Sequence, residues 1–313
     1  MANQYKIKVD TINMIQQQMM SPEEIIELFN MKEIDKSWSF AECKFSDTGK
    51  WTHNYHRYPA KFIPQLVEVF LKKYFQKGDT ILDPFSGSGT TLIEANVLGI
   101  NSIGIELSPF NVLIQKVKTK KYDIKELEWE VRDALRRVTD FSKEVINGEI
   151  SLFRNDINKF KTDNDYLNNW FAERALQEIL FYRDIIRDYK NNDVLTVILS
   201  RSARSARLIP HYDLARPKEP VRDTYWCIKH KKYCTPVKEA LKFIKRYSLD
   251  TIKRIKEFDT IRSDAFIKIY QRDAREINFP DDLTIDGIFT SPPYVCLLYT
   301  SDAADELDGV DLG

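Results

Sequence analysis

The stretch Thr80-Ile81-Leu82-Asp83-Pro84-Phe85-Ser86-Gly87-Ser88-Gly89-Thr90-Thr91 decides the fold of this 313-residue chain. Its first four residues form a short β-rich run. Gly87 and Gly89 then allow the backbone to turn sharply off a strand and to approach a ligand closely. Thr90 and Thr91 are expected to cap the helix that follows, whose first N–H groups are free to meet a ligand. The stretch therefore predicts a strand, a ligand-binding turn and a helix.

The residues after Gly89 limit the kinds of ligand that the turn is expected to bind. A phosphate-binding loop has a lysine after its last glycine, but Thr90 stands in that position. A dinucleotide fingerprint also fits poorly, and a glycine pair alone is weak evidence. Glu106 ends the next predicted strand, 102–106, where a carboxylate accepts hydrogen bonds from both hydroxyls of a ribose. A helix-capping Glu106 is the alternative interpretation.

Strand and helix patterns alternate around this stretch, which predicts an α/β fold with a parallel sheet. The other predicted elements are a short helix that starts at Ser21, helices over 65–75, 91–98 and 110–117, and strands over 266–270 and 286–289. Between residues 122 and 260 the pattern changes to long amphipathic helices, including 176–189 and 237–258, with an apolar run at 194–199. This connection is far longer than an ordinary one and predicts a mainly helical insertion.

The composition indicates a soluble protein. Hydrophobic residues make up 43% of the chain and charged residues 30%, and no apolar run is long enough to span a membrane. The N-terminus lacks the pattern of a secretion signal, so we expect a cytoplasmic protein without membrane contact. The four cysteines are then expected to be free thiols or metal ligands rather than a disulfide framework.

Positive charge is concentrated in one part of this neutral chain. Residues 201–250 contain thirteen Lys or Arg against five Asp or Glu. Such a stretch is suited to a phosphate backbone, although a solvated helical face is an equally ordinary explanation. Arg201, Arg204 and Arg207 would line one helical face if this segment is helical, to contact phosphates or bases or to pair with nearby acidic residues.

The chain resembles the S-adenosylmethionine-dependent DNA amino-methyltransferases. The resemblance rests on His56-Arg57-Tyr58-Pro59-Ala60-Lys61-Phe62-Ile63-Pro64, on Asp83 to Thr91 and on Gly104-Ile105-Glu106-Leu107-Ser108-Pro109, and it covers roughly residues 51–118 and 266–294. It implies a Rossmann-like class I methyltransferase sheet, and S-adenosyl-L-methionine as the cofactor.

The resemblance also implies roles for individual residues. Four of them, Asp83, Phe85, Gly87 and Gly89, would surround the methionine part of the cofactor. Thr90 and Thr91 would contact its carboxylate, and Glu106 its ribose. Asp273, at the end of a later strand, would contact the adenine amine. Tyr58 and Lys61 would close the pocket from the N-terminal side.

The segment Thr290-Ser291-Pro292-Pro293-Tyr294 matches the catalytic corner of the same family. An exocyclic base amine is a poor nucleophile because its lone pair is delocalised into the ring. Ser291 Oγ and the carbonyl of Pro292 would accept its two N–H groups, Pro293 would stiffen the corner, and Tyr294 would stack on a base flipped out of the duplex. Without its context, this segment is typical of an ordinary loop.

The family resemblance predicts a site-specific DNA methyltransferase that acts on double-stranded DNA. Serine before Pro-Pro-Tyr is associated in this family with cytosine N4, whereas Asp or Asn is more usual for adenine N6 and for guanine N2 of RNA. An adenine-N6 or RNA base methyltransferase is therefore the nearest alternative, and a noncatalytic nucleic-acid-binding fragment is an alternative of another class. A cognate restriction endonuclease is a candidate partner.

A second constellation contains His211, Cys227, His230 and Cys234. These residues are chemically sufficient for a structural zinc ion. Their spacing is not one of the common zinc patterns, and buried cysteines with surface histidines are the commoner outcome. We therefore expect no metal.

These patterns divide the chain into five parts. They are an N-terminal helical segment (1–50), the cofactor-binding part (51–121), the helical insertion as candidate target-recognition region (122–260), the catalytic part (261–295) and a non-native tail (296–313). The tail resembles translated adapter sequence, so we expect a C-terminally truncated chain in which the last strands of the sheet are missing.

Overall fold

In the computed structural model, the chain divides into two compact units. Each unit is described by itself. Unit 1 consists of residues 1–119 and 261–301, and unit 2 of residues 120–260 and 302–313. The structure describes Ser21, Glu23, Ile26, 39–56, 62–147, 160–212, 219–276, Phe279 and 283–292. Most of the helix predicted from Ser21, and the whole predicted tail 296–313, lie outside the described residues.

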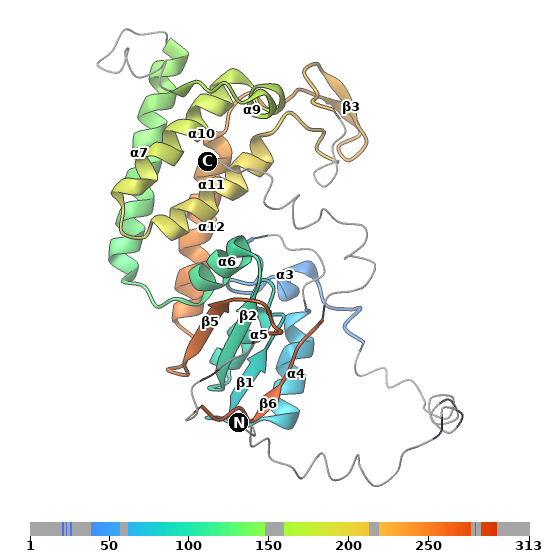
Figure 1. Cartoon of the computed structure of the whole chain (residues 1–313). Helices are drawn as coiled ribbons and strands as arrows, with labels where there is room; N and C mark the ends of the chain where they lie inside the picture. Colours follow the sequence, from blue (N-terminus) through green and yellow to red (C-terminus); the bar gives the residue numbers. More distant parts are fainter. Residues whose placement is uncertain are drawn as a thin grey trace. The chain divides into compact units, whose positions relative to one another are not determined.

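Unit 1 is built around a parallel sheet with the strand order β5-β2-β1-β6 (Figure 1). The strands are β1 (Thr80–Asp83), β2 (Asn101–Glu106), β5 (Ile267–Gln271) and β6 (Gly287–Ile288). Every neighbouring pair is parallel. Strand β1 lies between β2, which follows it in the chain, and β6, the last described strand. The strand order therefore reverses beside β1.

The described helices of unit 1 are α3 (Phe45–Thr48), α4 (Pro64–Tyr74), α5 (Thr90–Val97) and α6 (Pro109–Thr119). They fit the predicted pattern closely, apart from α3, which was not predicted. Helix α4 begins at Pro64, where the missing N–H costs no hydrogen bond. The expected α/β fold with a parallel sheet and a large helical insertion is confirmed.

The two faces of the sheet have separate cores because successive strand residues point to opposite faces. On one face, Ile81 packs with residues of α4, α5, the turn before β2 and the segment after β6, namely Val67, Leu71, Ala95, Ile100 and Phe289. On the other face, Leu82 packs with Ile103 and Ile105, beside the partly buried Tyr270. Strand β1 is buried along its whole length and forms the centre of unit 1.

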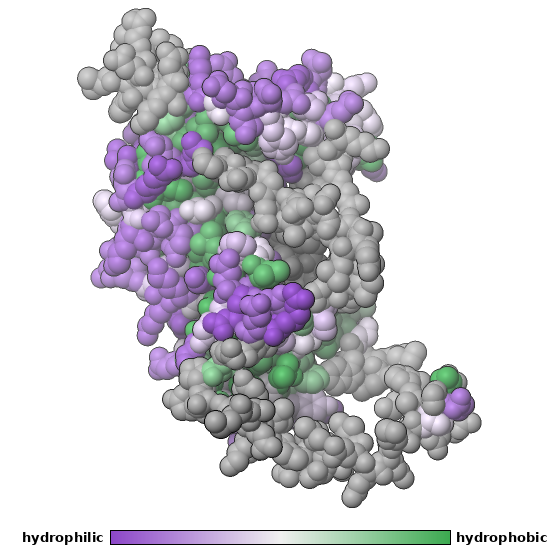
Figure 2. Space-filling view, viewed as in Figure 1, coloured by the Kyte–Doolittle hydropathy of each residue, from purple (hydrophilic) through white to green (hydrophobic). Residues whose placement is uncertain are grey.

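Unit 2 consists mainly of helices. They are α7 (Ile124–Asn147), α9 (Asp165–Trp170), α10 (Glu173–Ile185), the 3-10 turn η3 (Ile186–Asp188), α11 (Asn192–Ala206) and α12 (Leu241–Asp259). Helices α7, α10, α11 and α12 pack against one another. In the view of Figure 2 the described surface over this unit is mostly hydrophilic. None of the described helices is long and apolar enough to cross a membrane.

A buried carboxylate joins three helices of unit 2. Glu178 on α10 is fully buried and accepts hydrogen bonds from the backbone N–H groups of Ala240 (2.6 Å) and Leu241 (2.8 Å), where α12 begins. It also accepts a hydrogen bond from Ser142 of α7 and pairs with Arg174 at 2.9 Å. A negative charge at a helix N-terminus satisfies otherwise unpaired donors there. Glu178 therefore fixes the start of α12.

Unit 2 differs from the sequence expectation in one important respect. A two-stranded antiparallel hairpin, β3 (Tyr225–Cys227) and β4 (Lys232–Cys234), interrupts the helical pattern. Each strand has only three residues, too few for a period-two pattern to be recognised in the sequence. The apolar run 194–199 lies within helix α11.

The expected arginine stripe does not form along α11. The helix ends at Ala206, so Arg207 lies beyond it in extended conformation. The Nη2 atom of Arg201 donates to Asp250 Oδ2 over 2.7 Å, and its guanidinium lies over the ring of Tyr247. Pairing with an acidic residue, the alternative left open by the sequence, is what the structure shows for Arg201.

Candidate cofactor and catalytic site

The carboxyl ends of β1 and β6 lie side by side where the strand order reverses. In open parallel sheets, ligands bind outside the carboxyl ends of the strands at such a reversal. Asp83 ends β1, and Thr290 follows β6 closely. Thr290 Oγ1 donates a hydrogen bond to Asp83 Oδ1 over 2.7 Å, although 207 positions separate them in the chain. The structure thus joins the two segments that the sequence singled out.

Asp83 is a buried carboxylate held by several donors. It is 2% exposed, and burial raises its pKa, an effect opposed by the hydrogen bond from Thr290. The backbone N–H of Phe85 also donates to Asp83 Oδ1, over 3.2 Å. The Phe85 side chain itself is 43% exposed. These contacts fix the backbone at the exit of β1.

Two side chains of helix α6 donate hydrogen bonds to the glycine turn. Gln115 Nε2 donates to the carbonyl of Gly87, and Lys118 Nζ donates to the carbonyl of Ser88, each over 2.7 Å. Both side chains are almost completely buried. Because long polar side chains are rarely buried without partners, these two hydrogen bonds constrain the turn strongly. Hydrogen bonds within the protein therefore fix the conformation of the turn.

Three glycines permit this close packing. Gly87 and Gly89 have φ values of 50° and 80°, in the left-handed region that favours glycine. A Cβ on Gly104 of β2 would lie 2.8 Å from Leu92 Cδ1 and 2.9 Å from Ser86 Oγ. A side chain at Gly104 would therefore require the side chains of Leu92 and Ser86 to shift.

One expectation for the turn is wrong. Gly89, in left-handed conformation, is the N-cap of α5, and no side chain caps this helix. Thr90 and Thr91 do not cap the helix, because they already belong to its first turn, where both are buried. The N-terminus of α5, with its free backbone N–H groups, therefore follows the glycine turn directly.

The turn contains a polar atom suited to a ligand. Ser88 Oγ is buried and has no hydrogen-bond partner among the described residues. Buried hydroxyl groups are normally hydrogen-bonded, so an unpaired one at a helix N-terminus is consistent with a polar ligand at this place.

Glu106 ends β2 beside the glycine turn. Burial raises the pKa of Glu106, whereas the backbone N–H of Ser108, 2.9 Å from Oε1, favours the ionised carboxylate. The backbone of Gly87 contributes in the same direction, which places this carboxylate next to the turn. Glu106 therefore lies at the carboxyl end of β2, next to the glycine turn.

Asp273 follows β5, the strand paired with β2. Glu106 lies opposite Gln271 in the register, and the backbone N–H of Arg272 donates to the carbonyl of Glu106. The Asp273 carboxylate forms a two-pronged ion pair with Arg275, which lowers the pKa of Asp273 to about 2. An adenine amine at this position would donate a hydrogen bond to a carboxylate that is also paired with Arg275.

The segment predicted to be catalytic, 290–294, is described only in part. Phe289, which precedes Thr290, is buried against the rings of Phe62 and Phe70, with centroids at 5.2 and 4.5 Å. Ser291 and Pro292 follow from this anchor, Ser291 partly buried and Pro292 exposed. The predicted site residues Pro293, Tyr294, Tyr58 and Lys61 lie outside the described residues.

Sequence reasoning missed the polar residues of α6 that support the turn and Glu106. Asn111, Gln115 and Lys118 are spaced four and three residues apart, which places them on one helical face. All three are buried. A polar row on the buried face of a helix beside the glycine turn was the signal that could have revealed them.

A buried ionisable cluster was missed as well. His53 Nε2 lies 2.7 Å from Glu94 Oε1, and Lys50 Nζ lies 3.1 Å from the same atom. Burial raises the pKa of Glu94 to about 7. These residues are 41 and 44 positions apart in the chain, so no local pattern predicts the contact.

Comparison with known proteins gives consistent matches. The family model described as DNA methylase matches residues 2–117. Type II methyltransferase M.MjaII of Methanocaldococcus jannaschii is 36% identical over 84% of this chain and 63% of its own length. M.MvaI of Kocuria varians and M.BsoBI of Geobacillus stearothermophilus, also Type II methyltransferases, are 25% and 26% identical over 84% and 77% of this chain. No solved structure matches the chain significantly.

The parallel sheet, the glycine turn and these matches together are typical of a methyltransferase. The chain is similar to the N6/N4 amino-methyltransferase family of DNA methylases, whose methyl donor is S-adenosyl-L-methionine. It spans 63%, 57% and 49% of the lengths of the three relatives named above.

Proposed function

We propose that this chain belongs to a site-specific DNA methyltransferase that transfers a methyl group from S-adenosyl-L-methionine to cytosine N4 of a flipped base. The hydrogen bond from Thr290 to Asp83 carries this proposal. It joins the glycine turn to the segment that begins Ser291-Pro292, so a bound cofactor and a target amine would meet at the same strand ends.

The proposed cofactor pocket follows the carboxyl edge of the sheet. Methionine contacts are assigned to Asp83, Phe85, Gly87 and Gly89, carboxylate contacts to Thr90 and Thr91, the ribose to Glu106, the adenine amine to Asp273, and closure of the pocket to Tyr58 and Lys61. The buried Ser88 hydroxyl adds a donor or acceptor that sequence reasoning did not include. The raised pKa of Glu106 does not prevent ribose binding, because a carboxyl group accepts hydrogen bonds in either protonation state.

The chemistry requires an amine lone pair directed at an electrophilic carbon. When bound, S-adenosyl-L-methionine supplies that carbon as a methyl group on a sulfonium. Ser291 Oγ and the carbonyl of Pro292 would accept the two N–H groups of the base amine and thereby rotate its lone pair out of conjugation. Pro293 would keep the corner rigid, and Tyr294 would stack on the flipped base and offset part of the cost of extrusion.

The identity of the target base rests on Ser291. A serine at this position supports cytosine N4, and adenine N6 or an RNA base amine is the alternative outcome of the test below. Double-stranded DNA in the cytoplasm is the proposed substrate, with a restriction endonuclease of the same specificity as partner. Unit 2, which contains the basic stretch 201–250, is the proposed target-recognition region.

Methyl transfer from labelled cofactor to DNA and to RNA tests this function. We expect label in DNA, recovered as N4-methylcytosine after digestion to nucleosides. Recovery of N6-methyladenine would overturn the base assignment, and label in RNA alone would overturn the substrate assignment. Cofactor and DNA binding without transfer to either polymer would identify a noncatalytic nucleic-acid-binding protein.

Substitution of Ser291 tests the catalytic corner. Ser291→Ala removes one amine acceptor, so transfer should fall by about 100-fold or more, with cofactor affinity retained. Ser46→Ala, at an exposed serine of the same unit, is the matched control. Equal transfer rates in the two variants would remove Ser291 from the mechanism.

Substitution of Glu106 tests the ribose contact separately. Glu106→Ala should weaken cofactor binding by roughly 10-fold or more, because hydrogen bonds to a charged group contribute about 1.5–3 kcal/mol. Glu106→Gln retains an acceptor oxygen and should lose less affinity. Calorimetric titration with S-adenosyl-L-methionine measures both. Unchanged affinity in Glu106→Ala would exclude this assignment.

A further inference from the structure

The hairpin of unit 2 brings two thiols to one face. In its register, Tyr225 pairs with Cys234 and Trp226 pairs with Tyr233. Because side chains alternate along a strand, Cys227 lies on the same face as Tyr225 and its partner Cys234. Trp226 and Tyr233 occupy the opposite face, where they are 53% and 71% exposed. Both cysteines are free and buried.

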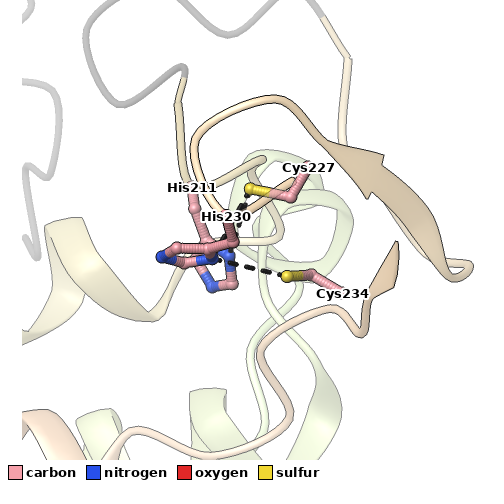
Figure 3. A group of neighbouring side chains, drawn as sticks. All are labelled: His211, Cys227, His230 and Cys234. Atoms are coloured by element: carbon pink, nitrogen blue, oxygen red, sulfur yellow. Dashed lines mark hydrogen bonds between the residues drawn. The ribbon is translucent and has the colours of Figure 1, made fainter. Parts of the chain in front are cut away.

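Two histidines converge on these thiols (Figure 3). His230 lies in the loop of the hairpin, and its Nδ1 atom is 3.5 Å from Cys227 Sγ and 3.4 Å from Cys234 Sγ. His211, which lies beyond the end of α11, places Nδ1 3.9 Å from Cys227 Sγ. The ligand atoms of all four residues lie within 4.8 Å of one another.

These distances match the edges of a tetrahedral metal site. With Zn–S bonds of about 2.3 Å and Zn–N bonds of about 2.0–2.1 Å, the ligand atoms of a tetrahedral zinc are about 3.3–3.8 Å apart. The contacts of His230 fall in this range, and that between His211 and Cys227 is slightly longer. The remaining pairs of ligand atoms lie within 4.8 Å of one another, so an ion would draw some of them closer to complete the tetrahedron.

Hydrogen bonds alone account poorly for this arrangement. The Nδ1 atom of His230 offers either one N–H or one lone pair, directed in the ring plane, yet it lies close to both sulfur atoms. Thiols are weak hydrogen-bonding groups, so several such contacts provide little reason to gather four side chains. A central cation would satisfy every one of these atoms at once.

The support around the site is also suited to a metal. The backbone N–H of His211 donates to Tyr225 Oη over 3.0 Å, which ties the incoming chain to strand β3. Isolated two-stranded hairpins are marginally stable in water, and these strands are only three residues long. A metal ion that links both strands, the loop and His211 would supply the missing stability.

We propose that Cys227, Cys234, His230 and His211 form a structural zinc site that fixes the β3–β4 hairpin in unit 2. Thiolate and imidazole ligands favour zinc over magnesium or calcium, which prefer oxygen. Four protein ligands leave no open position for a substrate, so the site is structural rather than catalytic. Its ligands are separate from the residues assigned to methyl transfer in unit 1.

Metal content tests the proposal directly. Untagged protein, purified without chelator, should contain about one zinc per chain by elemental analysis, as expected for a single four-ligand site. Cys234→Ser and His230→Gln should contain far less zinc, whereas Cys43→Ser, at a cysteine outside the cluster, should retain it. Absence of stoichiometric zinc from the unaltered protein would overturn the proposal, as would a disulfide between Cys227 and Cys234.

A second measurement does not depend on whether the variants fold. Cobalt(II) added to the unaltered, metal-depleted protein should give thiolate-to-cobalt charge-transfer bands and the intense visible bands of tetrahedral coordination. Zinc should displace it and abolish both. Weak octahedral bands without thiolate charge transfer would contradict the site. These readouts require no methyl transfer, so they are informative whether or not the proposed enzymatic function holds.

Discussion

At the scale of single residues, the hydrogen bond between Thr290 and Asp83 is the most consequential. Thr290→Val keeps the shape of the side chain but removes the donor to a buried carboxylate. We expect a decrease of about 1–3 kcal/mol in the free energy of unfolding, because a buried acceptor then lacks one partner. Thr290→Ser, which retains the hydroxyl, should show a smaller decrease. Urea unfolding measures both, and equal decreases would show that the hydrogen bond contributes nothing.

Glu94 makes stability depend on pH. Its ordinary pKa of 4.5 is raised to about 7 by burial, so the folded protein binds a proton that the unfolded chain has released between these values. The resulting stabilisation is present below pH 4.5 and is lost as the pH rises through about 7. Since one pKa unit corresponds to ~1.4 kcal/mol, the decrease in stability is up to ~3 kcal/mol.

The substitution Glu94→Gln removes this titration. Denaturant unfolding at pH 5 and pH 8 should show a smaller decline in stability in the variant than in the unaltered protein. Glu68→Gln, which also removes a carboxylate bound to Lys50, is the matched control and should keep the decline. An identical pH profile in Glu94→Gln would contradict the assignment.

At the scale of elements, the β3–β4 hairpin presents cations beside exposed rings. Lys229, Lys231 and Lys232 are exposed in and beside its loop, near the edge-to-face pair of Trp226 and Tyr233. Replacing the three lysines by Gln should weaken DNA binding and reduce its salt dependence. The slope of the logarithm of affinity against the logarithm of salt concentration should decrease by about 0.9 for each phosphate that is no longer neutralised. Fluorescence anisotropy over a range of salt concentrations measures this.

The control for the hairpin variant changes the same charge elsewhere in unit 2. Lys125, Lys143 and Lys253 are exposed on α7 and α12, and their replacement by Gln should leave the salt slope nearly unchanged. If the affinity of the two triple variants falls equally, general charge rather than the hairpin determines binding.

Much of the element pattern could be predicted from the sequence, because it depends on local signals. Glycines, a proline at a helix start and apolar periodicity are enough to place β1, α4, α5 and β2. The capping role of Thr90 was predicted wrongly, since sequence alone does not show that Gly89 adopts a left-handed conformation. The hairpin was missed because each of its strands has only three residues, too few to show a period-two pattern.

The candidate site was predictable only where one segment carried its own signal. Asp83, Glu106 and Ser291 stand in recognisable motifs. The contacts of Lys118 with Ser88 and of His53 with Glu94 depend on how separate elements pack, which no single segment records. The two cysteines and two histidines of the hairpin region were visible as a set, but only their distances favour a metal.

At the scale of the whole molecule, the two units have separate cores and different proposed ligands. We expect thermal unfolding to show two transitions. S-adenosyl-L-methionine should raise the temperature of one, because a ligand that binds only the folded state stabilises it. A strong zinc chelator should lower the other. Differential scanning calorimetry with each addition separately measures this.

One calorimetric result would contradict the prediction of two transitions. If the cofactor and the chelator moved one common transition, the units would unfold as a single cooperative body, contrary to this prediction. The Cys234→Ser variant should reproduce the effect of the chelator without any addition, whereas Cys43→Ser should not.

The position of unit 2 within the chain also bears on the order of folding. Only residues 84–100 separate β1 from its neighbour β2, but β5 and β6 emerge from the ribosome only after residues 120–260 of unit 2. Distant strand pairings form slowly, because the loop between them must first be closed. During synthesis, unit 2 would therefore fold before β5 and β6 pair with the sheet of unit 1, and the proposed cofactor site would form only after unit 2.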